Sequence, residues 1–293
     1  MRKKALIIGA GGQLGEALAK EFRSTHETVE AVHRSPRPGQ LSVELKELPA
    51  TLALLDRIRP DWILIAAAFC NVDLCETERE TCTQVNALAP HGVAEWARKN
   101  GAAAVYYSTD HVFDGAAPSY SEEDPVSPLS FYAKAKAEGE QGVREALPDR
   151  HLILRTSGLY GPETTRKNFV VRLVDQLRAG NRMRLPSDQW GSPTYNADLA
   201  AVTRFLLEKE ACGTYHTVGP DFIPRIELAR RVCSAFGLNE RLLDPLETAQ
   251  LRQPARRPLR VPLKRDRLQK SGAPPMRGVD AGLKALMPAL TPS

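Results

Sequence analysis

The stretch that decides the fold is ALIIGAGGQLG, residues 5–15. Its first four residues are apolar and predict a buried strand, and the residues from 13 onward predict a helix. Between the two, Gly9, Gly12 and Gly15 follow the spacing Gly-x-x-Gly-x-x-Gly. Glycine permits a tight turn and lets the backbone approach a pyrophosphate, which the free N–H groups at a helix start can bind. The order of strand, turn and helix predicts a dinucleotide site, with a purely structural turn as the alternative.

The alternation of apolar strands and helices continues to residue 156. It indicates a parallel sheet covered on both faces, the doubly wound (Rossmann) α/β fold, whose ligands lie at the carboxyl ends of the strands. The expected strands are 5–9, 28–33, 62–68, 103–108 and 151–156, and the expected helices are 13–22, 52–58, 76–99 (interrupted near Pro90) and 131–144. Later segments predict helices at 168–179, 198–208 and 226–236 and a strand at 213–218.

The chain therefore divides into two expected parts. Residues 1–156 form an NAD(P)-binding domain, to which 196–210 return. Residues 157–195 and 211–293 form a smaller C-terminal substrate-binding lobe. A length of 293 residues suffices for this arrangement around a sizeable core.

The net charge of +5 is unevenly distributed. Residues 252–270 carry eight basic side chains and one acidic one, which suits an anionic ligand such as a diphosphate. Arg257 is our candidate for binding substrate phosphates, with a solvated basic face as the alternative. Nucleic acid is not an expected partner, because prolines break the run and no aromatic residues interleave with it.

The remaining composition bears on location and metals. No apolar run approaches the roughly 18 residues that span a bilayer, so no membrane association is expected. The apolar stretch near the start is too short for a signal peptide, which predicts a cytoplasmic protein. The five cysteines have no paired spacing and are expected to be reduced, without a metal site.

The second expected strand ends at His33-Arg34-Ser35. Sites that prefer NAD usually place a carboxylate here, whereas an arginine accommodates the 2′-phosphate of NADP. Arg34 therefore predicts NADPH as the cofactor, with NADH possible. The alternative is an ordinary exposed arginine.

Tyr132 and Lys136 lie four residues apart in an expected helix and so share one face. A lysine ammonium near a phenol is expected to lower the pKa of the phenol, which can then pass a proton to a carbonyl oxygen. Thr109, at the end of an expected strand, can donate a second hydrogen bond to that oxygen. These three residues are our candidate catalytic group.

The chain resembles the extended short-chain dehydrogenases and, among them, the dTDP-4-dehydrorhamnose reductase group. The resemblance covers nearly the whole chain and rests on residues 9–15, 66–68, 72–73, 76, 85–86, 107–115, 132–136, 139–140, 155–157 and 188–194. It implies NAD(P)H-dependent reduction of a 4-keto group on a nucleotide-linked 6-deoxysugar by a homodimer. The expected cofactor site comprises Gly9, Gly12, Gln13, Leu14, Gly15, Arg34, Ala66, Ala67, Ala68, Asn86, Tyr132 and Lys136. The expected substrate site comprises Val72, His111, Gly158 and Arg257.

Three positions depart from the group's pattern. His111 stands where an aromatic residue is usual, and Gly158 stands where tryptophan is usual; both positions look like substrate contacts. Ser42-Val43-Glu44 replaces an Asp-rich segment near the adenine. A loss of aromatic area changes the shape of a pocket, so the identity of the sugar stays open.

Other members of the superfamily were weighed against this interpretation. A dehydratase would carry Thr-Asp-Glu, and His111 occupies the place of that glutamate. A nucleotide-sugar epimerase stays open because it shares the Tyr/Lys pair. A non-catalytic NADP-binding subunit resembling the beta subunit of methionine adenosyltransferase also stays open for the same reason.

Overall fold

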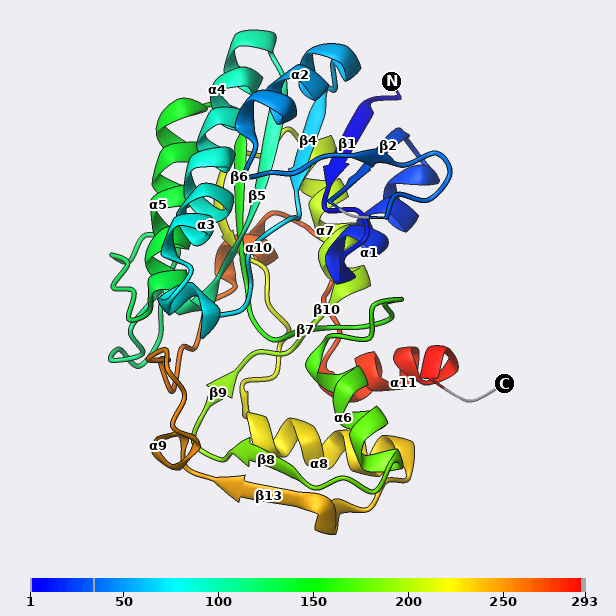
Figure 1. Cartoon of the computed structure of the whole chain (residues 1–293), viewed down its shortest axis with the longest axis vertical. Helices are drawn as coiled ribbons and strands as arrows, with labels where there is room; N and C mark the ends of the chain where they lie inside the picture. The colour runs from blue at the N-terminus through cyan, green and yellow to red at the C-terminus, as the bar shows by residue number, and fades with distance from the viewer. Residues whose placement is uncertain (1, 34, 291–293) are drawn as a thin grey trace.

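The computed structural model describes residues 2–33 and 35–290, so the prediction for Arg34 lies outside the described residues. A central sheet of seven parallel strands confirms the doubly wound α/β fold (Figure 1). The order of strands reverses between β1 and β4, and ligands of such sheets bind at this point. In spatial order the strands are β11 (Gly213–His216), β6 (His151–Thr156), β5 (Ala103–Thr109), β4 (Trp62–Ile65), β1 (Lys4–Ile8), β2 (Glu27–Val32) and β3 (Leu41–Ser42).

Helices cover both faces of the sheet (Figure 1). α1 (Gln13–Arg23) and α7 (Asn196–Glu208) pack together on one face, in an apolar cluster that includes Ala5 and Ile7 of β1. α2 (Leu48–Ile58), α4 (Ala89–Asn100) and α5 (Phe131–Ala146) lie on the other face, in a cluster that includes Leu6 and Ile8. Successive residues of β1 thus enter opposite layers, as the pleat of a strand requires.

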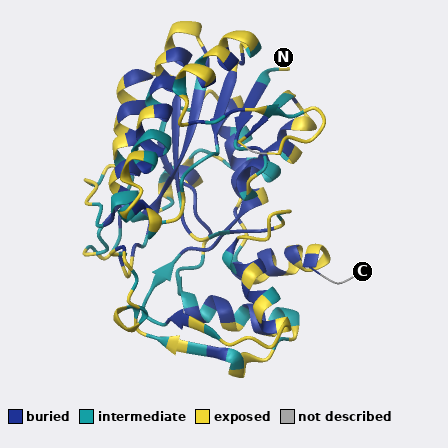
Figure 2. Ribbon diagram, in the orientation of Figure 1, coloured by how far each residue is buried: buried dark blue, intermediate teal, exposed yellow. Residues whose placement is uncertain are grey.

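A smaller lobe lies below the carboxyl ends of the strands and has its own apolar core (Figures 1 and 2). The core packs α6, α8 and α11 against β8. Of these helices, α11 was not expected from the sequence. No helix within residues 2–33 and 35–290 is long and apolar enough to span a membrane. The lobe and its connections comprise β7 (Leu159–Tyr160), α6 (Phe169–Arg178), β8 (Met183–Pro186), β9 (Trp190–Gly191), β10 (Thr194–Tyr195), β12 (Ile223–Pro224), α8 (Arg225–Phe236), β13 (Leu243–Leu246), α9 (Thr248–Leu251), α10 (Asp266–Lys270) and α11 (Val279–Leu290).

The structure differs from the expected boundaries in three places. β11 belongs to the central sheet, where Thr214 aligns with Ile153, so the segment that begins at residue 211 is not wholly part of the smaller lobe. β4 ends at Ile65, because the next two amides both donate to the carbonyl of Ile8 and turn the chain. The expected helix 76–99 consists of α3 (Arg79–Thr83), a π-helical turn (Gln84–Leu88) and α4, so Pro90 lies in the first turn of a new helix, where proline is tolerated.

Candidate active site

The glycine turn follows β1 directly and has room only for glycine at two positions. Gly9 has a φ of +93°, and a Cβ there would lie 2.5 Å from the Ala67 nitrogen. A Cβ on Gly15 would overlap the carbonyl oxygen of Gly9, so glycine lets α1 start against the strand end. Gly12 caps α1 in extended backbone and offers no side chain to the N–H groups of the first turn. Those N–H groups have no acceptor within the helix and face the end of the sheet, as pyrophosphate binding requires.

The walls beside this turn fit a dinucleotide. Ala66, Ala67 and Ala68 follow the end of β4, and the N–H groups of the first two are 2.9 Å from the Ile8 carbonyl oxygen. The side-chain nitrogen of Gln13 is buried and has no hydrogen-bond partner among the described residues. A ligand oxygen at the start of α1 would supply this missing acceptor. Leu14 is buried in the core and can contribute only its backbone.

Asn86 lies beneath the cleft wall rather than on its surface. Its side chain is fully buried and forms two 3.0 Å hydrogen bonds with the backbone of Phe69. The amide is therefore already paired, and it holds the loop that continues from the three alanines. This placement differs from the expected direct contact with a cofactor.

Tyr132 and Thr109 meet at the carboxyl end of β5. The Thr109 hydroxyl interacts with the Tyr132 phenol, donates to Asp110 Oδ1 at 3.2 Å and accepts the N–H of His111 at 3.2 Å. Lys136 lies one turn further along α5, where its Nζ donates to the Tyr107 carbonyl at 2.6 Å. The structure thus brings the three predicted catalytic residues together.

Burial governs the protonation of this group. Burial, together with nearby Cys70 and Asp110, raises the pKa of Tyr132 well above its usual value, and the hydrogen bond with Thr109 opposes the rise. The Lys136 ammonium donates to the Tyr107 carbonyl and lies 3.9 Å from the centre of the Tyr106 ring, and its expected lowering of the Tyr132 pKa stays a prediction. Burial lowers the pKa of Lys136 itself to about 8. Tyr132 is therefore a neutral phenol at pH 7, the form that can donate a proton.

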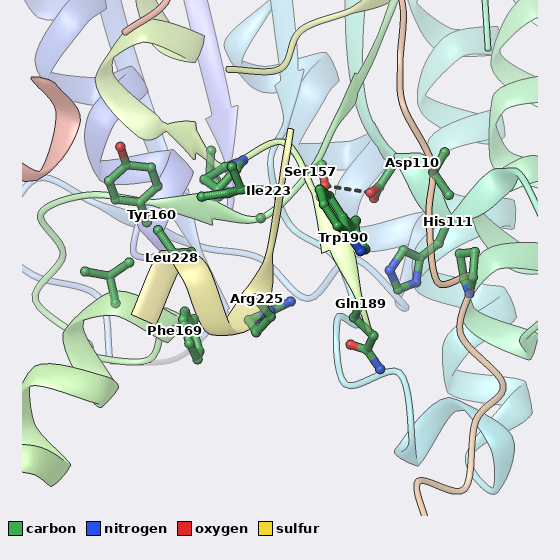
Figure 3. A pocket seen from close by; sticks show the side chains of 17 residues that line it. Asp110, His111, Ser157, Tyr160, Phe169, Gln189, Trp190, Ile223, Arg225 and Leu228 are labelled. Carbon is green, nitrogen blue, oxygen red and sulfur yellow. Dashed lines mark hydrogen bonds between the residues drawn. The ribbon is translucent and has the colours of Figure 1, made fainter. Parts of the chain in front are cut away.

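A cavity of about 190 Å³ begins beside this group, at Asp110 and His111, and extends into the smaller lobe (Figure 3). His111 lines it, with its ring edge-to-face with Tyr132 at 6.3 Å and its Nδ1 buried without a hydrogen-bond partner in the described chain. Burial lowers the pKa of His111, so the ring is neutral. Gly158 lines the cavity with a φ of +51°, and a Cβ there would lie 3.5 Å from Pro193 Cα, so a larger residue would reduce the cavity.

Val72 and Arg257 do not line this cavity. Asp73, next to Val72, receives both terminal nitrogens of Arg257 at 2.9 Å. This ion pair joins the loop after β4 to the C-terminal basic segment. The pair already neutralises the Arg257 charge. The predicted contact of Arg257 with substrate phosphates therefore requires that its guanidinium bind Asp73 and a phosphate at the same time.

A buried ion pair fixes α5 behind the site. Arg155 of β6 donates three hydrogen bonds to Glu140 at 2.7, 2.9 and 3.2 Å, and both side chains are 2% exposed. Glu140 lies one turn beyond Lys136. The pair therefore ties the helix that carries the candidate proton donor to the central sheet.

Several cavity residues escaped the sequence analysis. Asp110 accepts from Ser157 Oγ at 2.6 Å as well as from Thr109, and it was visible in the sequence as the neighbour of Thr109. Trp190 and Arg225 approach the cavity from segments far apart in the sequence (Figure 3). No periodicity or spacing marks the last two, because only the packing of the smaller lobe brings them to the site.

Comparison with known proteins gives a consistent picture. The family described as "RmlD substrate binding domain" matches residues 3–291. The structure of a dTDP-4-dehydrorhamnose reductase from Bacillus anthracis in complex with NADP superposes with a TM-score of 0.89 at 29% identity, covering 98% of this chain and 99% of that one.

Two relatives of known sequence carry different names. A probable dTDP-4,6-dihydroxy-2-methyloxan-3-one 4-ketoreductase from Streptomyces antibioticus is 32% identical over 97% of this chain and 94% of its own. Subunit beta of methionine adenosyltransferase 2 from Mus musculus is 34% identical over 83% of this chain and 75% of its own.

Proposed function

We propose that this chain, which belongs to the RmlD substrate binding domain family, is an NADPH-dependent reductase of a 4-keto group on a nucleotide-linked deoxysugar. The observation that carries the proposal is the meeting of Tyr132 and Thr109 next to His111 and Asp110 of the cavity wall, at the same end of the sheet as the glycine turn. A proton donor, a carbonyl-binding hydroxyl and a pyrophosphate cradle lie at one edge of the sheet. Ketone reduction needs all three.

The reaction follows from the protonation states of these residues. NADPH held at the glycine turn would supply the hydride. Tyr132, which burial keeps protonated, donates its phenolic proton to the carbonyl oxygen as that oxygen gains charge. The Thr109 hydroxyl turns from Asp110 toward the same oxygen and provides a second hydrogen bond. The Lys136 ammonium, held in place by the Tyr107 carbonyl, stabilises the phenolate that remains.

The named relatives support a dTDP-linked substrate, while the residues of this cavity determine which sugar it accepts. His111 gives the cavity a neutral imidazole, and Gly158 leaves it without a side chain, at two positions where the group usually has aromatic residues. We propose that the accepted 4-keto sugar fills the space above Gly158 and hydrogen-bonds to His111 Nδ1.

Turnover with a panel of substrates tests this function. Purified protein is mixed with NADPH and the 4-keto-6-deoxy forms of dTDP-, UDP- and GDP-glucose, and NADPH absorbance is followed. The proposal expects oxidation with at least one 4-keto sugar nucleotide. Intact NADPH with all three, in a protein that binds NADPH, would refute it.

The preference for NADPH rests on Arg34 and the NADP-bound relative. Fluorescence titration is expected to give tighter binding of NADPH than of NADH, with the difference lost in Arg34→Ala. Equal affinities in the unmodified protein would remove this part of the proposal. The homodimer and the cytoplasmic location likewise stay predictions.

The 34% identity to the mouse beta subunit favours a second candidate, a non-catalytic NADP-binding regulatory subunit. A regulatory subunit would be recognised by the enzyme that it binds, and not by a reaction of its own. Stable co-purification with a co-expressed methionine adenosyltransferase, without turnover of any 4-keto sugar, would support it.

A further inference from the structure

Arg225 is a cation without a partner in the cavity. It occupies the first position of α8, where its backbone N–H bonds to the Gln189 carbonyl at 2.8 Å. Its guanidinium lies over the Phe169 ring, 4.7 Å from the ring centre, and has no hydrogen bond or ion pair to any described residue. Figure 3 shows the side chain extending from α8 toward Trp190 and Gln189, into the space opposite His111.

The charges around Arg225 do not neutralise it. Among the described residues that line the cavity, Arg225 is the one lysine or arginine and Asp110 the one carboxylate. Both Asp110 oxygens already accept hydrogen bonds, from Thr109 and Ser157, and neither forms an ion pair with Arg225. Arg225 is half-buried, and Asp110 acts on it only through its charge, without an ion pair, so an anionic ligand would stabilise the guanidinium.

Arg257 offers the informative contrast. It belongs to the most basic stretch of the chain, yet it forms a two-pronged ion pair with Asp73. Arg225, which lies outside that stretch, keeps all its donors free and is within the cavity. The unpaired N–H groups of the Arg225 guanidinium, and not the local density of basic residues, indicate where an anion binds.

We propose that Arg225 binds the diphosphate of the sugar nucleotide and so orients the sugar toward Tyr132. The proposal rests on the proposed function. The planar guanidinium matches two phosphate oxygens, and Phe169 behind it keeps the plane fixed. His111 lines the same cavity as Arg225 and its ring contacts Tyr132, so a sugar in this cavity spans from the anchored phosphate to the reacting carbonyl.

Calorimetric titration with dTDP and with thymidine tests the assignment without turnover. Arg225→Gln is expected to raise the Kd for dTDP roughly 10- to 100-fold, the loss typical of charge-assisted hydrogen bonds, and to leave thymidine binding unchanged. The Kd of Arg225→Lys for dTDP is expected to lie between those of the unmodified protein and Arg225→Gln, since lysine keeps the charge but loses the planar guanidinium. Arg241→Gln, an exposed arginine of the same lobe, is the matched control and should bind like the unmodified protein. NADPH binding verifies that each variant is folded.

The outcomes separate this inference from the proposed function. If the unmodified protein binds dTDP and folded Arg225→Gln binds it equally well, the Arg225 assignment is wrong and the reductase function stands. If Arg257→Gln weakens dTDP binding and Arg225→Gln does not, the diphosphate binds at the C-terminal basic segment and not in the cavity, and the Arg225 assignment is wrong. If the unmodified protein binds NADPH but none of dTDP, UDP and GDP, the nucleotide-sugar function fails and the Arg225 inference with it.

Discussion

Removing the charge of Glu140 is expected to destabilise the protein strongly. The carboxylate receives three hydrogen bonds from Arg155, and both side chains are 2% exposed. Glu140→Gln keeps one acceptor oxygen and turns an amide NH₂ toward the other donors, so about two of the three bonds are lost. At about 1.5–3 kcal/mol for each charged bond, the cost agrees with the roughly 3–5 kcal/mol of an unpaired buried charge. The melting temperature should fall by on the order of 10 °C.

Thermal and urea unfolding followed by circular dichroism measure this effect. Glu138→Gln is the matched control, because Glu138 is exposed on the same helix, and its stability should change little. The double variant Glu140→Leu with Arg155→Met removes both charges and should recover most of the loss. A Glu140→Gln protein as stable as the Glu138→Gln control would refute the reasoning, since the buried guanidinium would then tolerate isolation.

Three further expectations concern the cofactor cleft. Gly15→Ala should abolish NADPH binding in a titration, because its Cβ would overlap the Gly9 carbonyl; normal affinity would contradict the tight turn. The pKa of Lys136, lowered by burial to about 8, means that its ammonium is lost as the pH rises through 8, so kcat/KM should fall above that pH; a flat profile to pH 10 would exclude a role for the charge. NADPH should protect Cys70 from iodoacetamide, since its thiol is exposed and lies 3.6 Å from the Ala68 carbonyl oxygen; mass spectrometry should find labelling of Cys212 unchanged by NADPH.

Local patterns in the sequence predict the cofactor side of the molecule well. The glycine turn and the Tyr132/Lys136 pair each lie within a few consecutive residues, and their spacing alone determines which face they share. The apolar runs of β1, β5 and β6 likewise predict buried parallel strands, because a strand that is covered on both faces has a continuous run of apolar residues.

The substrate side could not be predicted in the same way. Arg225 and Trp190 come together through the packing of α8 and β9, which no local signal encodes. The position of β11 also depends on tertiary pairing, since its sequence Gly-Thr-Tyr-His fits either lobe until it aligns with β6. The net rise in the pKa of Tyr132 escaped prediction because the burial that causes it depends on tertiary packing.

Single-turnover transfer of hydride in Tyr132→Phe tests the central claim most directly. The variant keeps the ring and loses only the phenolic hydroxyl, and with it the proton to be donated. With NADPH and an accepted 4-keto sugar nucleotide, its rate should fall about 10²- to 10⁴-fold while its Kd for NADPH changes little. A Tyr132→Phe protein that reduces the ketone at the unmodified rate would contradict the assignment of Tyr132 as the proton donor.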